Sequence, residues 1–134
     1  MSLILPPVVN CILMNGVIMS GRSRSNINLL NLEDHIEKAF KPNAFGRKPS
    51  AVALIINSPG GSAVQSALIA NRIRYLSKKY EVPTLAFAED VAASGGYWLL
   101  CAAEKIYATE CSIIGSIGVI SGGFGLQESI KKLG

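Results

Sequence analysis

The sequence predicts an α/β fold built on a parallel sheet. Two apolar runs, Ala51–Ile56 and Thr84–Ala88, indicate strands that are buried on both faces, and a helical segment follows each of them. This strand–helix–strand–helix order is typical of a parallel α/β core. The 134 residues suffice for one domain with its own core. We expect residues 1–134 to form a single domain that is truncated at its C-terminus.

The first third of the chain predicts a strand, a turn and a helix. Val8–Met14 is rich in apolar and β-branched residues, and Asn15-Gly16 is a turn signal, so Val17–Met19 is expected to return as the second strand of a hairpin. After a polar loop, Asn31 is expected to cap a helix over Leu32–Phe40. The apolar face of that helix is predicted to comprise Leu32, Ile36, Ala39 and Phe40.

The remaining elements follow the two central strands. A long helix is predicted over Ala63–Tyr80, and its buried stripe is predicted to hold Ile69, Ile73, Leu76 and Tyr80. A short buried helix is expected over Tyr97–Ala103. Further along the chain the expected elements are a strand at Lys105–Thr109, a bent strand at Ile113–Ile120, a loop at Ser121–Gly125 and a helix over Leu126–Leu133.

Composition narrows the classes of function. The chain is 49% hydrophobic and carries a net charge of +4, and its basic residues are scattered without interleaved aromatics. We therefore expect no nucleic-acid partner. Cys11, Cys101 and Cys111 form no CxxC pair, so they are expected to be reduced core residues, and no metal or other cofactor is expected.

Nothing in the sequence predicts a membrane span or a secretory signal. No apolar run reaches the roughly 18 residues that a transmembrane helix needs. Met1–Leu3 has no basic start and no long apolar segment after it. We expect a cytoplasmic or membrane-associated location, with any membrane anchor outside this segment.

Ser94 is the candidate nucleophile. It lies between a predicted strand and a predicted helix, with the small residues Ala92, Ala93, Gly95 and Gly96 around it. A strand-to-helix junction lifts the central side chain above the sheet, and the first turn of the helix leaves free N–H groups that can hold a negative oxygen. The alternative is that Ser94 is an ordinary helix N-cap.

A second glycine-rich loop supports the nucleophile interpretation. Asn57–Ser62 ends one strand as the Ser94 turn ends the next, and the carboxyl ends of parallel strands meet at one edge of a sheet. The amides of Gly61 and Gly95 could then face one spot, as acyl transfer requires for its oxyanion. Alternatively, Pro59-Gly60-Gly61 is only a tight turn. No lysine follows these glycines as in a phosphate loop, and no GxGxxG fingerprint is present.

The sequence offers no convincing general base for Ser94. His35, the single histidine, lies early in the chain among charged neighbours and is expected at the solvated surface. A neutral lysine can replace histidine if it is desolvated or lies beside another cation. Neither Lys105 nor the pair Lys131 and Lys132 is embedded in apolar sequence.

Four blocks in order resemble peptidase family S49, the family of signal peptide peptidase A and SohB-type proteases. They are INSPGGS at Ile56–Ser62, DVAASGGYW at Asp90–Trp98, KIYA at Lys105–Ala108 and IIGSIGV at Ile113–Val119. The resemblance implies a ClpP/crotonase-like fold of repeated ββα units with a mostly parallel sheet. It also implies that Ser94 is the nucleophile, that Gly61 and Gly95 supply oxyanion amides, and that the base is a lysine roughly fifty residues past the serine, beyond Gly134.

The resemblance further implies a function and partners. We expect a Ser–Lys endopeptidase that cleaves apolar or signal-peptide-like substrates and assembles into homo-oligomers, with residues 1–134 inactive on their own. The substrate peptide would bind extended, near Gly60, Tyr97 and Trp98. Tyr97 and Trp98 could equally be core residues of a helix.

Two other functions stay open at this level. A crotonase-like acyl-CoA enzyme would use the same paired amides to hold an enolate oxygen and would not need Ser94, although no adenine- or phosphate-binding segment is evident in the sequence. A catalytically incomplete assembly module would use the two loops for packing only.

Overall fold

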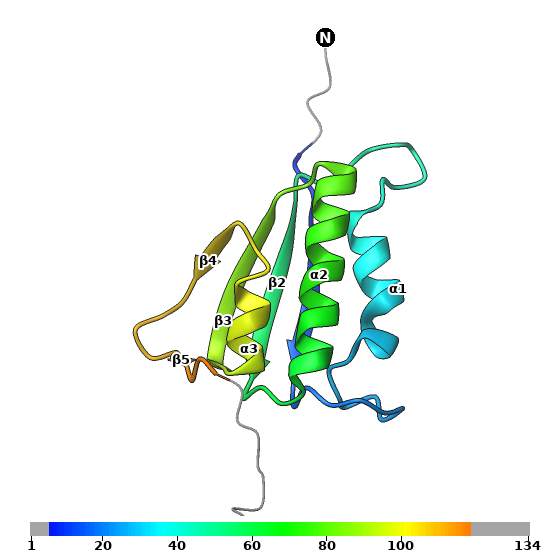
Figure 1. The fold of residues 1–134 in the computed structure, drawn as a ribbon. Coiled ribbons are helices and arrows are strands. Elements are labelled where there is room, and N and C mark those ends of the chain that lie inside the picture. The colour runs from blue at the N-terminus through cyan, green and yellow to red at the C-terminus, as the bar shows by residue number, and fades with distance from the viewer. Residues whose placement is uncertain (1–5, 119–134) are drawn as a thin grey trace, which may run out of the picture.

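The computed structural model describes residues 6–118 (Figure 1). Strands and helices alternate through most of this range, as βαβ connections require. The elements are β1 (Val9–Asn15), α1 (Leu29–Phe40), β2 (Ala51–Ser58), α2 (Ala63–Tyr80), β3 (Thr84–Ala93), α3 (Gly95–Leu100), β4 (Lys105–Tyr107) and β5 (Ile113–Gly115).

The five described strands form one parallel sheet. Its order is β1-β2-β3-β4, and β5 pairs with β3. The three helices lie on one face of this sheet, with α2 over its middle between α1 and α3 (Figure 1). The predicted parallel α/β class is therefore confirmed.

The core lies between the sheet and the helices. Its strand side comes from every second residue of β1 and from most of β2, and its helix side comes from the predicted stripes of α1 and α2. Leu32 and Tyr80, which were predicted to belong to these stripes, are only partly buried and pack at the edge of the core. The fully buried large side chains include Met14, Ile36, Phe40, Leu54, Ile56, Ile69, Ile73 and Leu76.

The predicted hairpin at Asn15-Gly16 is wrong. The Gly16 amide donates to the Asn57 carbonyl at 3.0 Å, so the chain continues beside β2 instead of reversing. Ile18 then forms isolated parallel bridges with Ile27 and with Gly61. The segment after Gly16 is instead held by the loop after β2, because the Ile18 amide donates to the Gly60 carbonyl and the Ser62 amide donates to the Ile18 carbonyl.

The first helix begins three residues earlier than predicted. Asn28, not Asn31, is its N-cap, because the Asn28 Oδ1 atom accepts from the Asn31 amide at 2.9 Å. The Asn31 side chain instead donates to the carbonyls of Ser23 and Asn26 in the preceding loop. Two asparagines three residues apart offer the same capping chemistry, and the loop contacts decide between them.

Several other boundaries differ from the prediction. β3 runs five residues past the predicted end at Ala88, and α3 begins at Gly95 and ends at Leu100 instead of spanning Tyr97–Ala103. The helix 63–80 is confirmed as predicted. β4 and β5 are shorter than expected. The expected loop Ser121–Gly125, the expected helix Leu126–Leu133 and the lysines Lys131 and Lys132 lie outside the described residues.

Candidate active site

Ser94 occupies a strained turn between β3 and α3. Its backbone angles are φ 52° and ψ −117°, a region that a residue with a side chain seldom adopts. Ser94 precedes the first helical residue, but its side chain makes no capping hydrogen bond. The alternative of an ordinary side-chain cap is therefore not observed, and the strained strand-to-helix turn is the geometry that exposes a nucleophilic hydroxyl.

Neighbouring backbone holds this turn in place. The Ser94 amide donates to the Gly115 carbonyl of β5 at 2.9 Å, and the Ser94 carbonyl accepts from the Trp98 amide at 3.1 Å. Both backbone groups of Ser94 are thus fixed by partners on different elements. Strain of this kind persists where the surrounding structure determines the conformation from several sides.

The loop after β2 packs directly on the Ser94 turn. Gly60 has φ +98°, and a Cβ built on it would lie 2.7 Å from the Ala93 carbonyl oxygen and 2.8 Å from the Ser94 Cβ. Gly61 is held from the other side, where the Ile18 amide donates to the Gly60 carbonyl at 2.9 Å and the Ser62 amide donates to the Ile18 carbonyl at 2.7 Å. The two glycine-rich turns that the sequence predicts to meet are in contact.

The amides of Gly61 and Gly95 make no hydrogen bond among the described residues. Within residues 6–118, neither N–H group donates a hydrogen bond, whereas the adjacent Gly60 amide donates to the Ser58 hydroxyl at 3.1 Å. Both glycines line the same pocket as Ser94. A hydroxyl with two free backbone donors beside it is the arrangement that stabilises a tetrahedral oxyanion.

The pocket has a volume of about 800 Å³ and runs between α2 and α3. It contains five of the six predicted site residues, namely Ser94, Gly61, Gly95, Tyr97 and Trp98, whereas the sixth, Gly60, is buried. Sequence reasoning assigned no role in the site to the rest of the lining, which comes partly from α2 and the end of α3 and partly from the block Ile113–Val119. These residues are Ala63, Arg74, Cys101, Ser116, Ile117 and Gly118.

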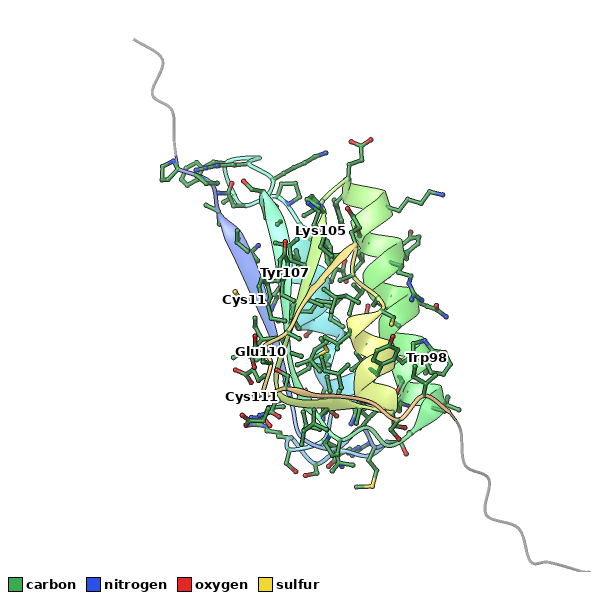
Figure 2. The ribbon with its side chains drawn as sticks, turned by 90° about the vertical axis from the view of Figure 1, so that its left-hand side faces the viewer. Cys11, Trp98, Lys105, Tyr107, Glu110 and Cys111 are labelled. Carbon is green, nitrogen blue, oxygen red and sulfur yellow. The ribbon has the colours of Figure 1, made fainter. Side chains whose placement is uncertain are left out.

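Tyr97 and Trp98 have different environments. Tyr97 is half-buried and packs against the core, as one interpretation predicts, and it also lines the pocket. Trp98 is 38% exposed and projects on the helix side of the molecule (Figure 2). The Cys101 thiol, one turn later, interacts with the Tyr97 hydroxyl and raises the pKa of that hydroxyl above its ordinary value.

The basic candidates lie away from this pocket. His35 is exposed on α1 and, as expected, belongs to the surface, where it lines a separate depression with Cys11 and Asn31. Lys105 is exposed at the start of β4 (Figure 2). Arg74 lines the pocket and donates to the Cys101 carbonyl at 2.7 Å, but a guanidinium stays protonated and cannot act as a base.

Cys11 and Cys111 correct the expectation of three core thiols. Both are exposed, and Cys101 is only half-buried. Among the described residues, no group of His, Cys, Asp and Glu side chains could hold a metal ion. In that same part of the chain, none of the helices has the length and apolar character needed to cross a bilayer.

The fold resembles that of a solved protease. Among solved structures, a membrane-bound stomatin-specific protease superposes with a TM-score of 0.67 over 89% of this chain and 52% of its own length, at 20% sequence identity. This likeness concerns the fold. The parallel sheet and the strained serine turn after β3 are in keeping with it.

Residues 77–134 match the family model of peptidase family S49. The putative signal peptide peptidase SppA of Enterococcus faecium is 37% identical over 90% of this chain and 35% of its own length. Protease 4 of Haemophilus influenzae is 34% identical over 96% of this chain and 20% of its own length.

A protein of Brucella melitensis named Na(+)/H(+) antiporter NhaA is 45% identical over 96% of this chain. The match covers 17% of that protein, so most of its length has no counterpart here. The chain spans between 17% and 35% of the length of these three curated relatives.

Proposed function

We propose that this chain supplies the nucleophile and the oxyanion-binding amides of a serine endopeptidase. The observation that carries the proposal is the shared pocket in which the strained Ser94 lies with the unbonded amides of Gly61 and Gly95. The match to peptidase family S49 supports the same reaction. An acyl-CoA enzyme would have no use for the strained serine.

The reaction begins with attack of the Ser94 Oγ atom on a peptide carbonyl carbon. The new C–O bond pushes negative charge onto the carbonyl oxygen, which the Gly61 and Gly95 amides bind, and the hydroxyl proton passes to a base. Collapse breaks the C–N bond, the same proton leaves with the amine, and water then hydrolyses the acyl-enzyme. Losing one such oxyanion donor typically costs about 3 kcal/mol of transition-state stabilisation.

We propose that the base is a lysine outside residues 1–134. The described residues that line the pocket include neither a lysine nor a histidine. A Ser–Lys pair needs a lysine that is neutral near pH 7, which burial or a neighbouring cation achieves. On this proposal, residues 1–134 alone bind peptides but turn them over poorly.

The substrate proposed for this pocket is an apolar peptide in an extended conformation. Trp98 and Ile117 are 38% and 79% exposed, and both belong to the lining. Apolar side chains of a substrate would gain burial against them. Gly60 would contribute to substrate binding only indirectly, because it packs against the Ser94 turn.

The first prediction tests Ser94 in the full-length protein. Ser94→Ala should lower the hydrolysis of an apolar fluorogenic peptide by at least about 1,000-fold, because it removes the hydroxyl that is proposed to form the acyl-enzyme. The circular dichroism spectrum and the melting temperature should persist. Ser112→Ala, a serine outside the pocket, is the matched control and should retain full turnover.

A fluorophosphonate probe supplies the second readout of the same experiment. Mass spectrometry of the digested, labelled protein should find the adduct on Ser94. Turnover that survives in Ser94→Ala, or an adduct on the pocket residue Ser116 instead, would contradict the proposal.

A further inference from the structure

A bulge interrupts the pairing of β3, the strand that leads to Ser94, with β2. Ile56 of β2 pairs with Ala88 of β3, but Ser58 pairs with Ala92. Asn57 therefore faces three residues of β3, namely Glu89, Asp90 and Val91. A bulge bends its strand and leaves the extra residues without ladder partners.

The bulge divides β3 between two neighbours. Before it, Leu85–Phe87 pairs with β4, and after it, Val91–Ala93 pairs with β5. The chain thus changes its pairing partner at the bulge (Figure 1). The direction in which β3 continues, and hence the location of Ser94 three residues after Val91, depends on how the bulge is held.

The Asn57 carboxamide holds the bulge through both of its polar atoms. Its Nδ2 group donates to the Asp90 Oδ2 atom at 3.1 Å, and its Oδ1 atom accepts from the Val91 amide at 3.2 Å. The Asn57 main chain is itself anchored, because its carbonyl accepts from the Gly16 amide at 3.0 Å. One side chain therefore joins β2 to two consecutive residues of the bulge.

The two halves of the candidate site depend on different parts of this arrangement. Gly61 is fixed by the Ile18 backbone, whereas Ser94 is fixed by β3 and β5. The bulge lies in β3 between most of the residues that pair with β2 and the Ser94 turn, so its shape sets where Ser94 lies relative to Gly61. An error of about 1 Å in the placement of a reacting group can cost roughly 100-fold in rate. We infer that Asn57, with Asp90 as its partner, is a positioning residue that sets Ser94 against the Gly61 amide.

This inference rests on the proposed function and deepens it. A purely structural Asn57 would stabilise the fold without any special effect on Ser94. The two roles differ in the kinetic constant they change: a positioning residue alters kcat and the rate of serine modification in protein that is still folded, and it leaves KM nearly constant.

The test exchanges the two side chains in the full-length protein. Asn57→Asp keeps an acceptor for the Val91 amide but replaces the donor to Asp90 with a second carboxylate. We expect kcat to fall at least about tenfold, with KM within about threefold of the original value. Adding Asp90→Asn restores a donor–acceptor pair in the opposite sense, and the double variant should recover to within about threefold.

Asn10→Asp is the matched control. Asn10 is also a half-buried asparagine of the sheet, and its Nδ2 group donates to the Ala39 carbonyl at 2.8 Å, away from the pocket. This variant should lower the melting temperature but leave the kcat of the folded protein unchanged. If Asn57→Asp keeps its kcat, or the double variant recovers none of the loss, the positioning role is overturned.

Hydrogen exchange separates this inference from the proposed function. In Asn57→Asp the amides of Val91 and Ser94 should exchange at least about tenfold faster than in the original protein, and the double variant should restore their protection. If Ser94 is not the nucleophile, the Ser94→Ala variant keeps its turnover, and the exchange result in Asn57→Asp is not affected. Unaltered exchange in Asn57→Asp would overturn the positioning role of Asn57, whether or not Ser94 is the nucleophile.

Discussion

At the scale of single residues, the site depends on positions that only a few residue types can fill. Ser94 is a non-glycine residue at positive φ, and it is compensated by hydrogen bonds at its amide and its carbonyl. Gly60 and Gly61 have no room for a side chain, because backbone atoms lie where a Cβ would be. A larger side chain at either glycine would therefore disturb the site, even though the added atoms take no part in the reaction.

A comparison of two glycines tests this effect. Gly61→Ala would put a Cβ 2.1 Å from the Ile18 carbonyl oxygen, whereas Gly21 has a similar positive φ of +126° and nothing within 4 Å. Both variants carry the backbone penalty, but only Gly61→Ala adds overpacking. We expect Gly61→Ala to lower the free energy of unfolding by about 1–3 kcal/mol more than Gly21→Ala.

Chemical denaturation measures that difference, and fluorophosphonate labelling of Ser94 reports the local effect. Gly61→Ala should also slow the labelling, because Ile18 and the Ser94 turn both contact this loop. Equal stabilities of the two alanine variants would show that the loop can move away from Ile18.

At the scale of elements, charged side chains join α1 to α2 on the outside of the core. Arg72 of α2 pairs with Glu33 and Glu37 of α1, and Glu37 also pairs with Lys41 at 2.7 Å. The Lys41 ammonium, through its hydrogen bond and charge, lowers the pKa of the Glu37 carboxyl and has its own pKa raised. These groups are solvent-accessible, so salt screens them and their contribution is small.

The pH dependence of stability follows from these directions. Because the pKa of Glu37 is lowered in the folded state, its contribution is present above its unfolded pKa of about 4.3 and is lost as the pH falls through the lower, folded value. Because the pKa of Lys41 is raised, its contribution is lost only as the pH rises above about 10.4. The stabilisation therefore spans the window between these two limits.

Glu37→Gln should reduce the melting temperature at pH 7 and at low ionic strength, and the reduction should vanish as the pH falls below about 4. Asp34→Asn, at an exposed carboxylate on the same helix, is the control and should show a smaller change. Thermal melts from pH 3 to pH 8 measure both, with the pH range chosen around the ordinary carboxyl pKa. If the melting temperature lost in Glu37→Gln became larger toward low pH, this result would contradict the ion-pair explanation.

At the scale of the whole molecule, the two faces of the sheet differ. The helices cover one face, whereas on the other face Leu13 is 70% exposed and the rings of Phe87 and Tyr107 stack at 5.0 Å. The register aligns Leu13, Ile55, Phe87 and Tyr107 in one row across four strands. Cys11 and Tyr107 lie on this face, remote from α2 (Figure 2).

Two leucines on adjacent strands measure this asymmetry. Leu54→Ala should lower the free energy of unfolding by about 2–5 kcal/mol, because Leu54 is fully buried in the core. Leu13→Ala should cost less than about 0.5 kcal/mol if its face is open to solvent. Denaturant unfolding of the 134-residue chain gives both values.

A large loss in Leu13→Ala would mean that this face is covered in solution. If that loss grew with protein concentration, it would support the predicted homo-oligomer, since association stabilises a fold by mass action.

The fold was predictable because its signals are local and strong. The runs at β2 and β3 are strongly apolar, and the 18 residues of α2 carry a helical repeat between clear start and stop signals. The weak points were the turn after β1 and the choice between Asn28 and Asn31 as cap. In both, the local chemistry suits two structures, and contacts from elsewhere in the chain choose one.

The candidate site was predictable only in part. The pairing of Gly61 with Ser94 follows from parallel strands that end at one edge of the sheet, so sequence spacing was enough. The lining residues Arg74 and Ile117 were not predicted, because Arg74 comes from the fourth turn of α2 and Ile117 from the segment after β5. The bulge at Asp90 was also missed, since Glu89 and Asp90 resemble the polar end of a strand.

The sequence by itself determined the order of strands and helices, most of the buried stripes and the presence of the two glycine-rich turns, because each of these depends on residues near one another in the chain. The tertiary structure decided that the chain after β1 packs beside Gly61, that Asn57 joins the two halves of the bend in β3, and that one sheet face lies open. These features depend on which distant backbone groups remain to be hydrogen-bonded once the sheet has formed, and no local pattern records that.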